Sequence, residues 1–239
     1  MAKKKKSGRI RSLLQGLMLK LILMWVFITL VVILPLRWLN PPLTSYQFID
    51  ALHNSADPLK VISGRWLNSK EIPAAMKLAV IAAEDQRFPE HFGLDLHALW
   101  QAYKHNRQGK HLHGGSTITQ QLAKNLYLWP ARSYIRKALE AWFSIWMEIL
   151  WSKPRILEIY LNVVEFGPQV FGIDSAAKNY FHQSGRHLNK RQCALLAAVL
   201  PFPKQVNLRH PSPYILQQQH WVFRQMIQLG GRNYLNKLR

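Results

Sequence analysis

The sequence predicts a mainly α-helical protein in which one transmembrane helix precedes a single domain. Two observations lead to this prediction. From Leu21 to Leu36 the chain is apolar and uncharged, and extension back to Leu13 gives about 24 residues, enough to span a bilayer at ~1.5 Å per residue. From about residue 69 onward most segments have apolar residues at helical spacing, whereas strand signals are weak and no internal repeat is present.

The amino-terminal end predicts an anchor rather than a removable leader. Residues 1–12 form a basic cytoplasmic tail, and residues 13–38 form the signal-anchor helix. Basic residues before the span keep the amino terminus in the cytoplasm and place the remainder of the chain outside. A cleaved signal peptide is the alternative, but no small-x-small site follows the apolar segment, where the chain reads RWLNPPLTSY.

The chain is strongly basic, with 32 Lys and Arg against 12 Asp and Glu and a net charge of +20 over 239 residues. The first 20 residues hold seven of these basic residues and no acid, so residues 21–239 retain +13. This excess predicts an anionic partner: nucleic acid, membrane headgroups or a phosphorylated substrate. Export of the domain argues against nucleic acid and favours lipid. The single cysteine, Cys193, allows no intrachain disulfide and is expected to be a core thiol.

A connector is predicted at residues 39–68, where the sequence is rich in proline and serine. The extracytoplasmic domain then occupies residues 69–239. Its first helix is predicted in SKEIPAAMKLAVIAAED, with Ser69 as the cap and Pro73 in the first turn.

The later helices follow from capping and periodicity. STITQQLAKNLYL begins with Thr117 and Gln120 at capping-box spacing. Further helices are predicted in SYIRKALEAWFSIWMEILW, KPRILEIYLNVV, DSAAKNYF and NKRQCALLAAVL. Residues 104–113, KHNRQGKHLH, form a polar basic segment between helices and are expected to be mobile.

The first group of residues suited to chemistry is EDQRFPEHFG, which holds three of the twelve acids: Glu84, Asp85 and Glu90. Glu84 and Asp85 end an Ala-rich helix, where the helix dipole disfavours negative charge. One interpretation is a set of solvated helix-end acids that pair with Arg87. The other is a carboxylate with a raised pKa that serves as a general base.

The second group lies on the helix that begins near Thr117. Spacings of three and four residues place Thr117, Gln121, Lys124 and Asn125 on one face. A Gly-Gly turn and a free helix amino end precede this face, so it predicts a donor-rich anion site. The alternative is an exposed polar face, but such a face normally mixes Glu or Asp with Lys, and this one has neither acid.

The third group is ARSYIRKALE, in which Arg132, Arg136 and Glu140 follow one another at four-residue intervals. A surface ladder of ion pairs, worth only ~0.3–0.5 kcal/mol each, is one interpretation. A functional carboxylate is the other, because Glu140 directly precedes the apolar AWFSIW. The aromatic residues of AWFSIW are expected in the core, with a membrane-interface face as the alternative.

Two further patterns are not expected to be functional. His111 and His113 have no third ligand spaced nearby, so no metal site is predicted. Ser175 to Lys178, SAAK, has the Ser-x-x-Lys pattern of penicillin-recognising enzymes. Its partner motifs are absent, because no Ser-x-Asn occurs and the one Lys-[Ser/Thr]-Gly is Lys6–Gly8 on the cytoplasmic side.

Taken together, these segments resemble the peptidoglycan glycosyltransferase family (glycosyltransferase family 51) in its monofunctional, membrane-anchored form. The five motifs of that family occur in order: EDQRFPEHFG, GGSTITQQLAKN, RKALE, KPRILEIYLN and GPQVFGIDSAAKNYF. The match covers most of residues 45–210. It implies a lysozyme-like helical fold with two lobes around a cleft.

The resemblance also implies a substrate and a set of site residues. Lipid II, a disaccharide-pentapeptide on undecaprenyl diphosphate, would accept the lipid-linked growing chain on its GlcNAc 4-hydroxyl, with inversion, a new β-1,4 link and release of undecaprenyl diphosphate. By motif position Glu84 would be the general base and Glu140 the second essential carboxylate. The substrate-binding positions would be Asp85, Phe88, His91, Ser116, Thr117, Gln121, Lys124, Asn125, Arg132 and Arg136.

Elementary chemistry agrees with these assignments. Displacement of an α-linked diphosphate with inversion needs a base opposite the leaving group, and Glu84 can take the proton of the acceptor hydroxyl. The departing diphosphate needs cations rather than a proton, which Lys124, Arg132 and Arg136 can supply. Glu140 would orient sugar or cation. No cofactor is required, although a diphosphate leaving group would suit stimulation by Mg²⁺ or Mn²⁺.

The expected location is the bacterial inner membrane, with the catalytic domain in the periplasm and residues 104–113 as a flap over the cleft. An anchored enzyme would search for its bilayer-bound substrate in two dimensions. Cell-wall synthases or division proteins are expected partners, because no cross-linking domain is predicted. The rival functions are a lysozyme or lytic transglycosylase, which needs no phosphate-binding cations, and a non-enzymatic scaffold for anionic lipid or glycan.

Overall fold

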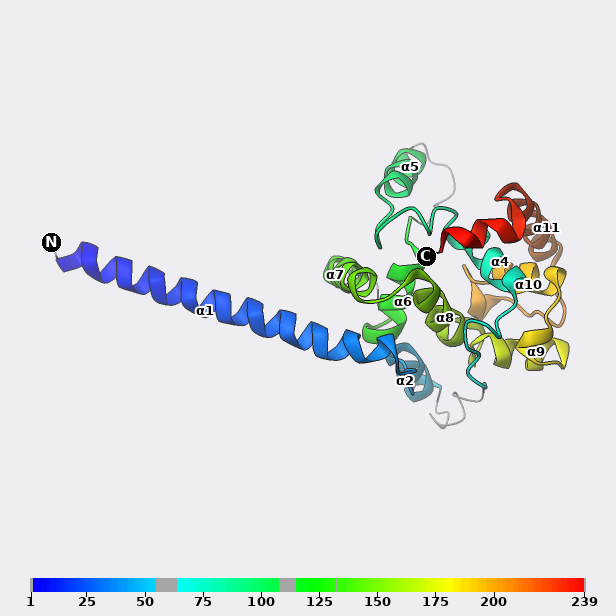
Figure 1. Ribbon diagram of the computed structural model, residues 1–239, viewed down its shortest axis with the longest axis horizontal. Coiled ribbons are helices and arrows are strands. Elements are labelled where there is room, and N and C mark those ends of the chain that lie inside the picture. The colour runs from blue at the N-terminus through cyan, green and yellow to red at the C-terminus, as the bar shows by residue number, and fades with distance from the viewer. Residues whose placement is uncertain (1, 55–63, 108–114, 132, 239) are drawn as a thin grey trace. The chain divides into compact units, whose positions relative to one another are not determined.

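A computed structural model describes residues 2–54, 64–107, 115–131 and 133–238 (Figure 1). The chain divides into two compact units, Met1–Leu39 and Asn40–Arg239. The first unit contains α1 (Ala2–Ile33) and the 3-10 turn η1 (Leu34–Arg37). All the other described helices and strands belong to the second unit.

The first unit agrees with the predicted membrane span. Within it, Leu13–Arg37 is long and apolar enough to cross a bilayer, with a mean hydropathy of 2.8. The α-helix ends at Ile33, two residues before Pro35, whose ring and missing N–H do not fit a helix interior. Arg37 then lies over the ring of Trp38 at 5.4 Å, a pairing suited to a membrane boundary.

The second unit is mainly helical, as the sequence predicts. Its one sheet among the described residues is the antiparallel pair β1–β2, in which Glu165 lies opposite Phe171. In chain order its elements are α2 (Ser45–His53), α4 (Ala74–Glu84), α5 (Leu96–Arg107), α6 (Ile118–Tyr127), α7 (Tyr134–Leu150), α8 (Lys153–Val163), β1 (Glu165–Gly167), β2 (Val170–Phe171), α9 (Ile173–Phe181), η2 (Gly185–His187), α10 (Lys190–Ala198), η3 (Pro203–Gln205), α11 (Pro213–Gln228) and η4 (Gly231–Lys237).

Two groups of helices build this unit. One consists of α4 packed against α10, α11 and η4, and the other of α6 packed against α2, α7 and α8. The groups meet where α4 ends and α6 begins, because the main-chain N–H of Ile118 donates to Asp85 Oδ2 over 3.0 Å. This arrangement matches the expected mainly helical fold with two lobes.

The central helix α4 explains why charged groups lie in the interior at this junction. Each residue from Leu78 to Ala82 is buried, as expected of a helix that is apolar on all sides. Its carboxyl end therefore points into protein rather than into solvent. Glu84 and Asp85 are the residues that end it.

The start of α4 differs from the prediction. The helix begins at Ala74 with Pro73 at its cap position, because the backbone of Pro73 has an extended ψ of 135°. Ser69 does not cap it. Instead Lys77 Nζ donates to the carbonyl and hydroxyl oxygens of Ser69, at 2.5 and 3.0 Å.

The predicted connector at residues 39–68 contains the helix α2. Thr44 and Gln47 form a reciprocal capping box at its start. Ser45 Oγ donates to the carbonyl of Leu128 over 2.7 Å, which ties α2 to the end of α6. Most of this segment therefore belongs to the compact unit that begins at Asn40. Nine residues between proline-rich flanks were too short for periodicity to reveal the helix.

Helix α5 continues to Arg107, so the first four residues of the predicted polar segment 104–113 are helical. Residues 108–114 lie outside the described residues. The same holds for the two histidines, His111 and His113, and for most of the expected flap, which stays a prediction.

Helix α7 turns its charged side inward. The residues of α7 that are buried are Glu140, Ser144, Met147 and Glu148. The aromatic residues of AWFSIW are half-buried, and Ile149 on the same side is 54% exposed. The aromatic residues expected in the core are thus only partly buried, and one of them, Phe143, stacks against Tyr127 of α6 with ring centres 4.9 Å apart.

Candidate active site

Glu84 is the last residue of α4 and lines a pocket of about 250 Å³ together with Asp85, Ser116 and Thr117. Its Oε2 accepts a hydrogen bond of 2.7 Å from Gln121 Nε2. Its Oε1 is buried and has no hydrogen-bond partner among the described residues. A carboxyl group with one enclosed, uncommitted oxygen is suited to proton exchange.

The pKa of Glu84 lies above its ordinary value. Burial is the main cause, the hydrogen bond from Gln121 opposes it, and the negative charge of Asp85 adds to the increase. The positive charge of Lys124 also acts on Glu84 and lowers its pKa. The predicted base is therefore within electrostatic reach of a predicted phosphate-binding cation.

Gln121 is held in place from the other side. The hydroxyl of Tyr160 on α8 donates to Gln121 Oε1 over 2.8 Å. Because the amide oxygen is occupied, the amide nitrogen is directed at Glu84. Tyr160 is fully buried, so three helices fix the orientation of this hydrogen-bond chain.

Of the two adjacent acids Glu84 and Asp85, it is Asp85 whose carboxylate is stabilised by several hydrogen-bond donors. Both of its carboxylate oxygens lie 2.9 Å from His91 Nε2, and Oδ2 also accepts from the N–H of Ile118 at the start of α6. The carboxylate that the end of α4 disfavours is thus stabilised by the amino end of another helix. Arg87 pairs with Glu90 and Asp95 instead, which argues against the interpretation as solvated acids.

Phe88 and His91 were expected to bind substrate, and the structure buries both. Phe88 is fully buried, and the side chain of His91 is 5% exposed. Lys153 Nζ lies 4.4 Å from the centre of the Phe88 ring and donates to the carbonyl of His91 over 2.7 Å. These contacts hold the segment that follows Glu84, and the expected part of Phe88 and His91 in substrate binding stays a prediction.

The start of α6 has the predicted capping box. Thr117 accepts from the N–H of Gln120, and its own hydroxyl donates to the carbonyl of Gly93 over 2.6 Å. Ser116, one residue earlier, lines the pocket and is half-buried. Asn125 near the other end of α6 is buried, and its carbonyl accepts from Ser45 Oγ at 3.2 Å.

Lys124 is half-buried on α6, and its Nζ lies 5.5 Å from the centre of the Tyr46 ring. Burial lowers the pKa of Lys124, the charge of Glu140 opposes this decrease, and the charges of Arg136 and Lys137 add to it. The charge of Glu165 acts in the same direction as that of Glu140, so three cations and two carboxylates interact in this part of the site.

Glu140 is buried, and both of its carboxylate oxygens accept hydrogen bonds. Arg136 donates to Oε1, and Lys137 Nζ donates to Oε2 over 2.8 Å. Lys137 Nζ also donates to Ser116 Oγ over 2.7 Å, which joins this cluster to the pocket that Glu84 lines. Of the two interpretations of this segment, the structure favours an inward carboxylate over a ladder of surface ion pairs, because Glu140 is buried, although Lys137 stays partly exposed.

Arg132 lies outside the described residues, so its predicted part in phosphate binding stays a prediction. Two further residues were not singled out from the sequence. Lys137 was missed although it stands three residues before Glu140, a spacing that also stacks on a helix. Tyr46 was missed because the segment that holds it was assigned to a connector.

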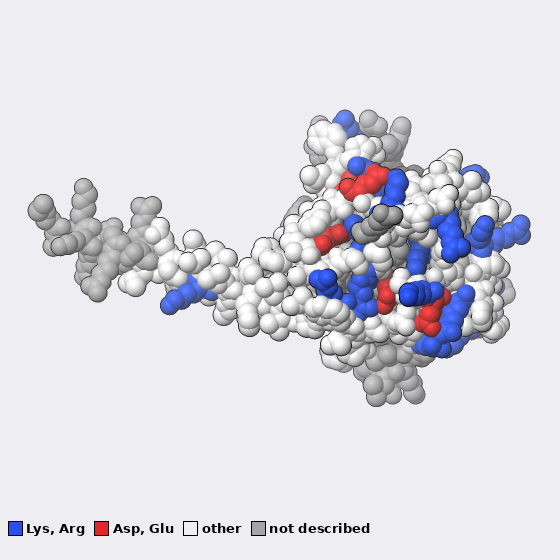
Figure 2. Space-filling view, in the orientation of Figure 1, with Lys and Arg blue, Asp and Glu red and all other residues white. Residues whose placement is uncertain are grey.

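Charge is not confined to the pocket. Figure 2 shows Lys and Arg side chains in several groups on the visible face, with fewer Asp and Glu among them. Among the described residues, no group of three or more His, Cys, Asp or Glu could hold a metal ion. Cys193 is buried as expected, and burial raises its pKa to about 12.

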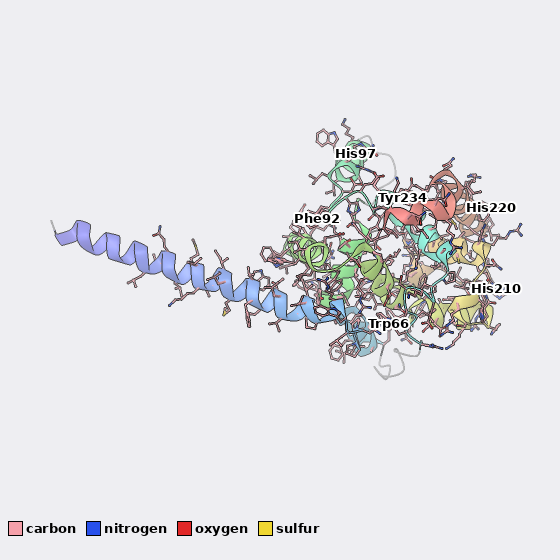
Figure 3. All side chains as sticks on the ribbon, in the orientation of Figure 1. Trp66, Phe92, His97, His210, His220 and Tyr234 are labelled. Atoms are coloured by element: carbon pink, nitrogen blue, oxygen red, sulfur yellow. The ribbon has the colours of Figure 1, made fainter. Side chains whose placement is uncertain are left out.

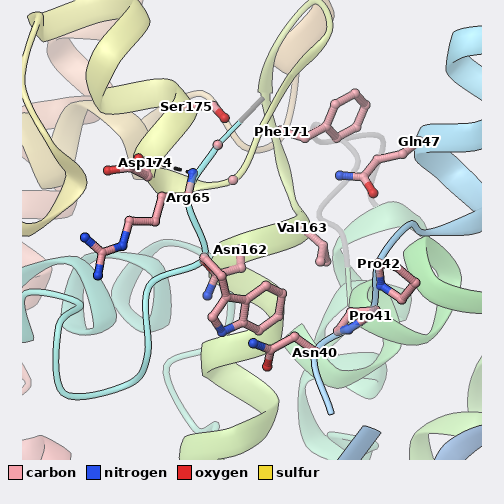
Figure 4. A pocket seen from close by; sticks show the side chains of 13 residues that line it. Asn40, Pro41, Pro42, Gln47, Arg65, Asn162, Val163, Phe171, Asp174 and Ser175 are labelled. Carbon is pink, nitrogen blue, oxygen red and sulfur yellow. Dashed lines mark hydrogen bonds between the residues drawn. The ribbon is translucent and has the colours of Figure 1, made fainter. Parts of the chain in front are cut away.

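A second pocket of about 220 Å³ is lined by Asn40, Gln47, Trp66 and Asp174, among others (Figure 4). Asp174 Oδ2 accepts from the N–H of Arg65 there, at 3.3 Å. None of the residues predicted to bind substrate is among its described lining residues. Lys178 of the SAAK pattern pairs with Asp174 rather than with Ser175.

Comparison with known proteins connects this geometry to a family. The model of the transglycosylase family matches residues 53–227. A protein of Ectopseudomonas mendocina named biosynthetic peptidoglycan transglycosylase is 44% identical over 232 residues, which is 96% of this chain and 95% of that protein. Proteins with the same name from Shewanella oneidensis (44% identity, 88% of this chain, 90% of that protein) and Pseudomonas aeruginosa (43% identity, 96% and 99%) are also similar.

The family match spans the junction of α4 and α6, the cation cluster on α7 and the whole of α8 and α9. The similarity to the three relatives extends over nearly their full lengths. This chain belongs to the transglycosylase family.

Proposed function

We propose that this chain polymerises the glycan strands of peptidoglycan from lipid II. Membership of the transglycosylase family and the relatives named biosynthetic peptidoglycan transglycosylase support the reaction class. The observation that carries the chemical assignment is the combination of Glu84, whose Oε1 has no partner among the described residues, with three cations that surround the same site.

In this reaction Glu84 takes the proton of the acceptor 4-hydroxyl as that oxygen attacks the anomeric carbon of the lipid-linked chain. The bond from that carbon to the diphosphate breaks on the opposite side, which gives inversion. Lys124, Arg136 and Lys137 stabilise the negative charge that develops on the diphosphate, in a site where burial strengthens such contacts. The proton then leaves Glu84 through the open pocket.

Glu140 acts by holding the cations. Its carboxylate fixes Arg136 and Lys137, and it keeps these two like charges close together in a buried position. Both of its oxygens are already engaged, so a direct part in proton transfer does not fit it. Thr117, Asp85, Phe88 and His91 position the backbone around the pocket.

The raised pKa of Glu84 would suit a lysozyme-like acid as well, so it does not separate synthesis from cleavage. The cations do. A cleaving enzyme has no diphosphate to release, whereas Lys124 forms no ion pair among the described side chains, and an anionic ligand would offset the cost of its burial. A scaffold for anionic lipid would also supply an anion, so the argument against it is the buried carboxyl oxygen of Glu84 that has no partner among the described residues, which anion binding alone does not need.

The test is incubation of the purified full chain with fluorescent lipid II, followed by separation of polymer from substrate. The wild type is expected to form polymer and Glu84→Gln to form none above background. In a parallel reaction with preformed glycan strands, neither protein should release fragments. Polymer formation by Glu84→Gln, or fragment release by the wild type, would contradict the proposal.

The location and partners are part of the same proposal. The span at Leu13–Arg37 anchors the chain in the bacterial inner membrane, with the basic tail in the cytoplasm and the catalytic unit in the periplasm. The half-exposed apolar side of α7 supports contact with the lipid surface. Cross-linking of the strands falls to other cell-wall synthases or division proteins. No resident metal is required, and Mg²⁺ or Mn²⁺ stimulates by screening the diphosphate.

A further inference from the structure

The carboxyl-terminal segment η4 lies beyond the part of the chain that the family model matches, which ends at residue 227. Two glycines reverse the chain after α11: Gly230 and Gly231 have φ of 95° and 61°, a region that residues with a Cβ rarely adopt. The reversal returns η4 to α4, against which it packs (Figure 1). The last helical turn of the protein thereby reaches the helix that ends in Glu84.

Tyr234 makes the central contact of η4 (Figure 3). Its hydroxyl donates to the main-chain carbonyl of Gln86 over 2.5 Å, and the residue is 7% exposed. The side chain of Gln86 is held as well, because its Nε2 donates to Gln225 Oε1 on α11 over 3.0 Å. Lys237 covers the Tyr234 ring at 4.8 Å and pairs with Glu90 at 3.4 Å.

The position of Gln86 makes these contacts relevant to catalysis. It stands two residues after Glu84, where α4 has already ended and regular helical hydrogen bonds no longer fix the backbone. On one side of this segment Asp85 is tied to His91 and to α6. On the other side the carbonyl of Gln86 is tied to Tyr234. A carbonyl in this position would otherwise lack a buried partner or recruit water.

We propose that Tyr234 is a positioning residue for the catalytic carboxylate, and that its hydroxyl keeps the segment after Glu84 closed so that Glu84 stays enclosed. The carboxyl-terminal turn is then part of the working active site, although it lies outside the matched family domain. The proposal rests on the proposed role of Glu84 as the base.

The proposal has a signature that simple destabilisation lacks. Burial is the main reason why the pKa of Glu84 is raised. If loss of the Tyr234 hydroxyl loosens the segment and admits water, the pKa of Glu84 falls toward its ordinary value. The base is then formed at lower pH, so the acid limb of the kcat/KM profile moves to lower pH. The charges that face Glu84, namely Asp85 and Lys124, are unchanged by the substitution.

The experiment compares Tyr234→Phe with Tyr214→Phe in the full chain, using lipid II polymerisation between pH 5 and 9. Tyr214 is the matched control, since it is an exposed tyrosine on α11. For Tyr234→Phe we expect kcat to fall about tenfold, because a buried carbonyl loses its donor, with KM within about twofold and the acid limb at lower pH. Tyr214→Phe is expected to match the wild type.

Two outcomes overturn the inference: a folded Tyr234→Phe with wild-type kcat and acid limb, or a fall in kcat that follows only from a lower folded fraction by circular dichroism. If Tyr234→Phe does not fold, Gln225→Leu serves instead, because it removes the contact from α11 to the Gln86 side chain, whose remaining bond is to the carbonyl of Ala82, and should shift the acid limb in the same direction. Glu84→Gln separates the two proposals. If it is inactive while Tyr234→Phe behaves as wild type, only the positioning role fails.

Discussion

Glu84 and Glu140 both place carboxyl oxygens in the protein interior, but they differ in the number and charge of the groups that contact them. Glu84 receives one amide hydrogen bond, and its second oxygen has no partner within the described part of the chain. Glu140 is bound by a guanidinium and an ammonium group. The difference separates two uses of a glutamate. One carboxyl has an oxygen available for the proposed proton transfer, and the other holds two cations.

The largest expected effect comes from Glu84→Gln. Loss of a general base reduces the rate by about 10²- to 10⁴-fold. Because a buried carboxylate with few partners is costly, the neutral amide should leave the melting temperature equal to or above that of the wild type. Parallel measurement of lipid II turnover and thermal unfolding checks both parts. A variant that melts well below the wild type would mean that Glu84 is structural.

Glu140→Gln, unlike Glu84→Gln, should reduce the stability of the folded protein. Removal of one partner from a buried ion pair costs about 3–5 kcal/mol, because Arg136 and Lys137 are left close together without a counter-charge. Urea unfolding measures this loss. Glu148→Gln is the matched control, since Glu148 is a buried glutamate of the same helix that pairs with Lys153 over 2.8 Å. We expect both variants to lose a similar amount of stability, and only Glu140→Gln to bind the diphosphate more weakly. Weaker binding in both variants, or in neither, would contradict the proposed role of Glu140.

Lys137→Met tests the cation that the sequence did not single out. The cation contacts the diphosphate before it departs and stabilises the charge that develops as it leaves, so its loss should raise KM for lipid II and lower kcat, with kcat/KM reduced by about tenfold or more. Steady-state kinetics at fixed ionic strength measures the two constants. Lys70→Met, at an exposed lysine outside the pocket, is the control and should leave both unchanged. An unaltered kcat/KM in Lys137→Met would remove this residue from the anion site.

Gln121→Leu tests how the hydrogen bond from Gln121 affects the pKa of Glu84. The hydrogen bond from Gln121 stabilises the charged carboxylate and lowers its pKa, so its loss should raise the pKa of Glu84 further. The base then forms only at higher pH, and the acid limb of kcat/KM moves upward. This shift is opposite in sign to the one expected for Tyr234→Phe. A pH profile with both variants moving in the same direction would contradict this account of the carboxyl group.

The smallest effect is expected from chelation. Since Lys124, Arg136 and Lys137 supply the positive charge, excess EDTA should leave polymer formation within about twofold of the untreated rate. Addition of Mg²⁺ or Mn²⁺ should raise it modestly. Metal-free buffer with and without each ion measures this directly. Complete loss of activity in EDTA, restored by one divalent ion, would show that a metal is essential.

Much of the site could be predicted from local sequence. The capping box at Thr117 and Gln120 fixed the start of α6, and the residues on its face follow from helical spacing. The spacing of Arg136 and Glu140 likewise predicted their contact. Local rules did not reveal that Asp85 is stabilised by the start of α6, 33 residues further along the chain. They also did not reveal that Tyr46 lies beneath Lys124.

The sequence by itself determined the apolar amino-terminal helix, the helical class and the order of the motifs, because these depend on hydropathy and on spacings within one helix. The base candidate followed from the position of Glu84 in the first motif of the family that the chain resembles. Only the tertiary structure decided which carboxyl group keeps one oxygen without a partner among the described residues and which is paired with two cations. It also decided that the side chains of Phe88 and His91 are buried, and that Tyr234 returns to the segment after Glu84. Burial and long-range pairing set these properties, and both arise only when distant segments pack together.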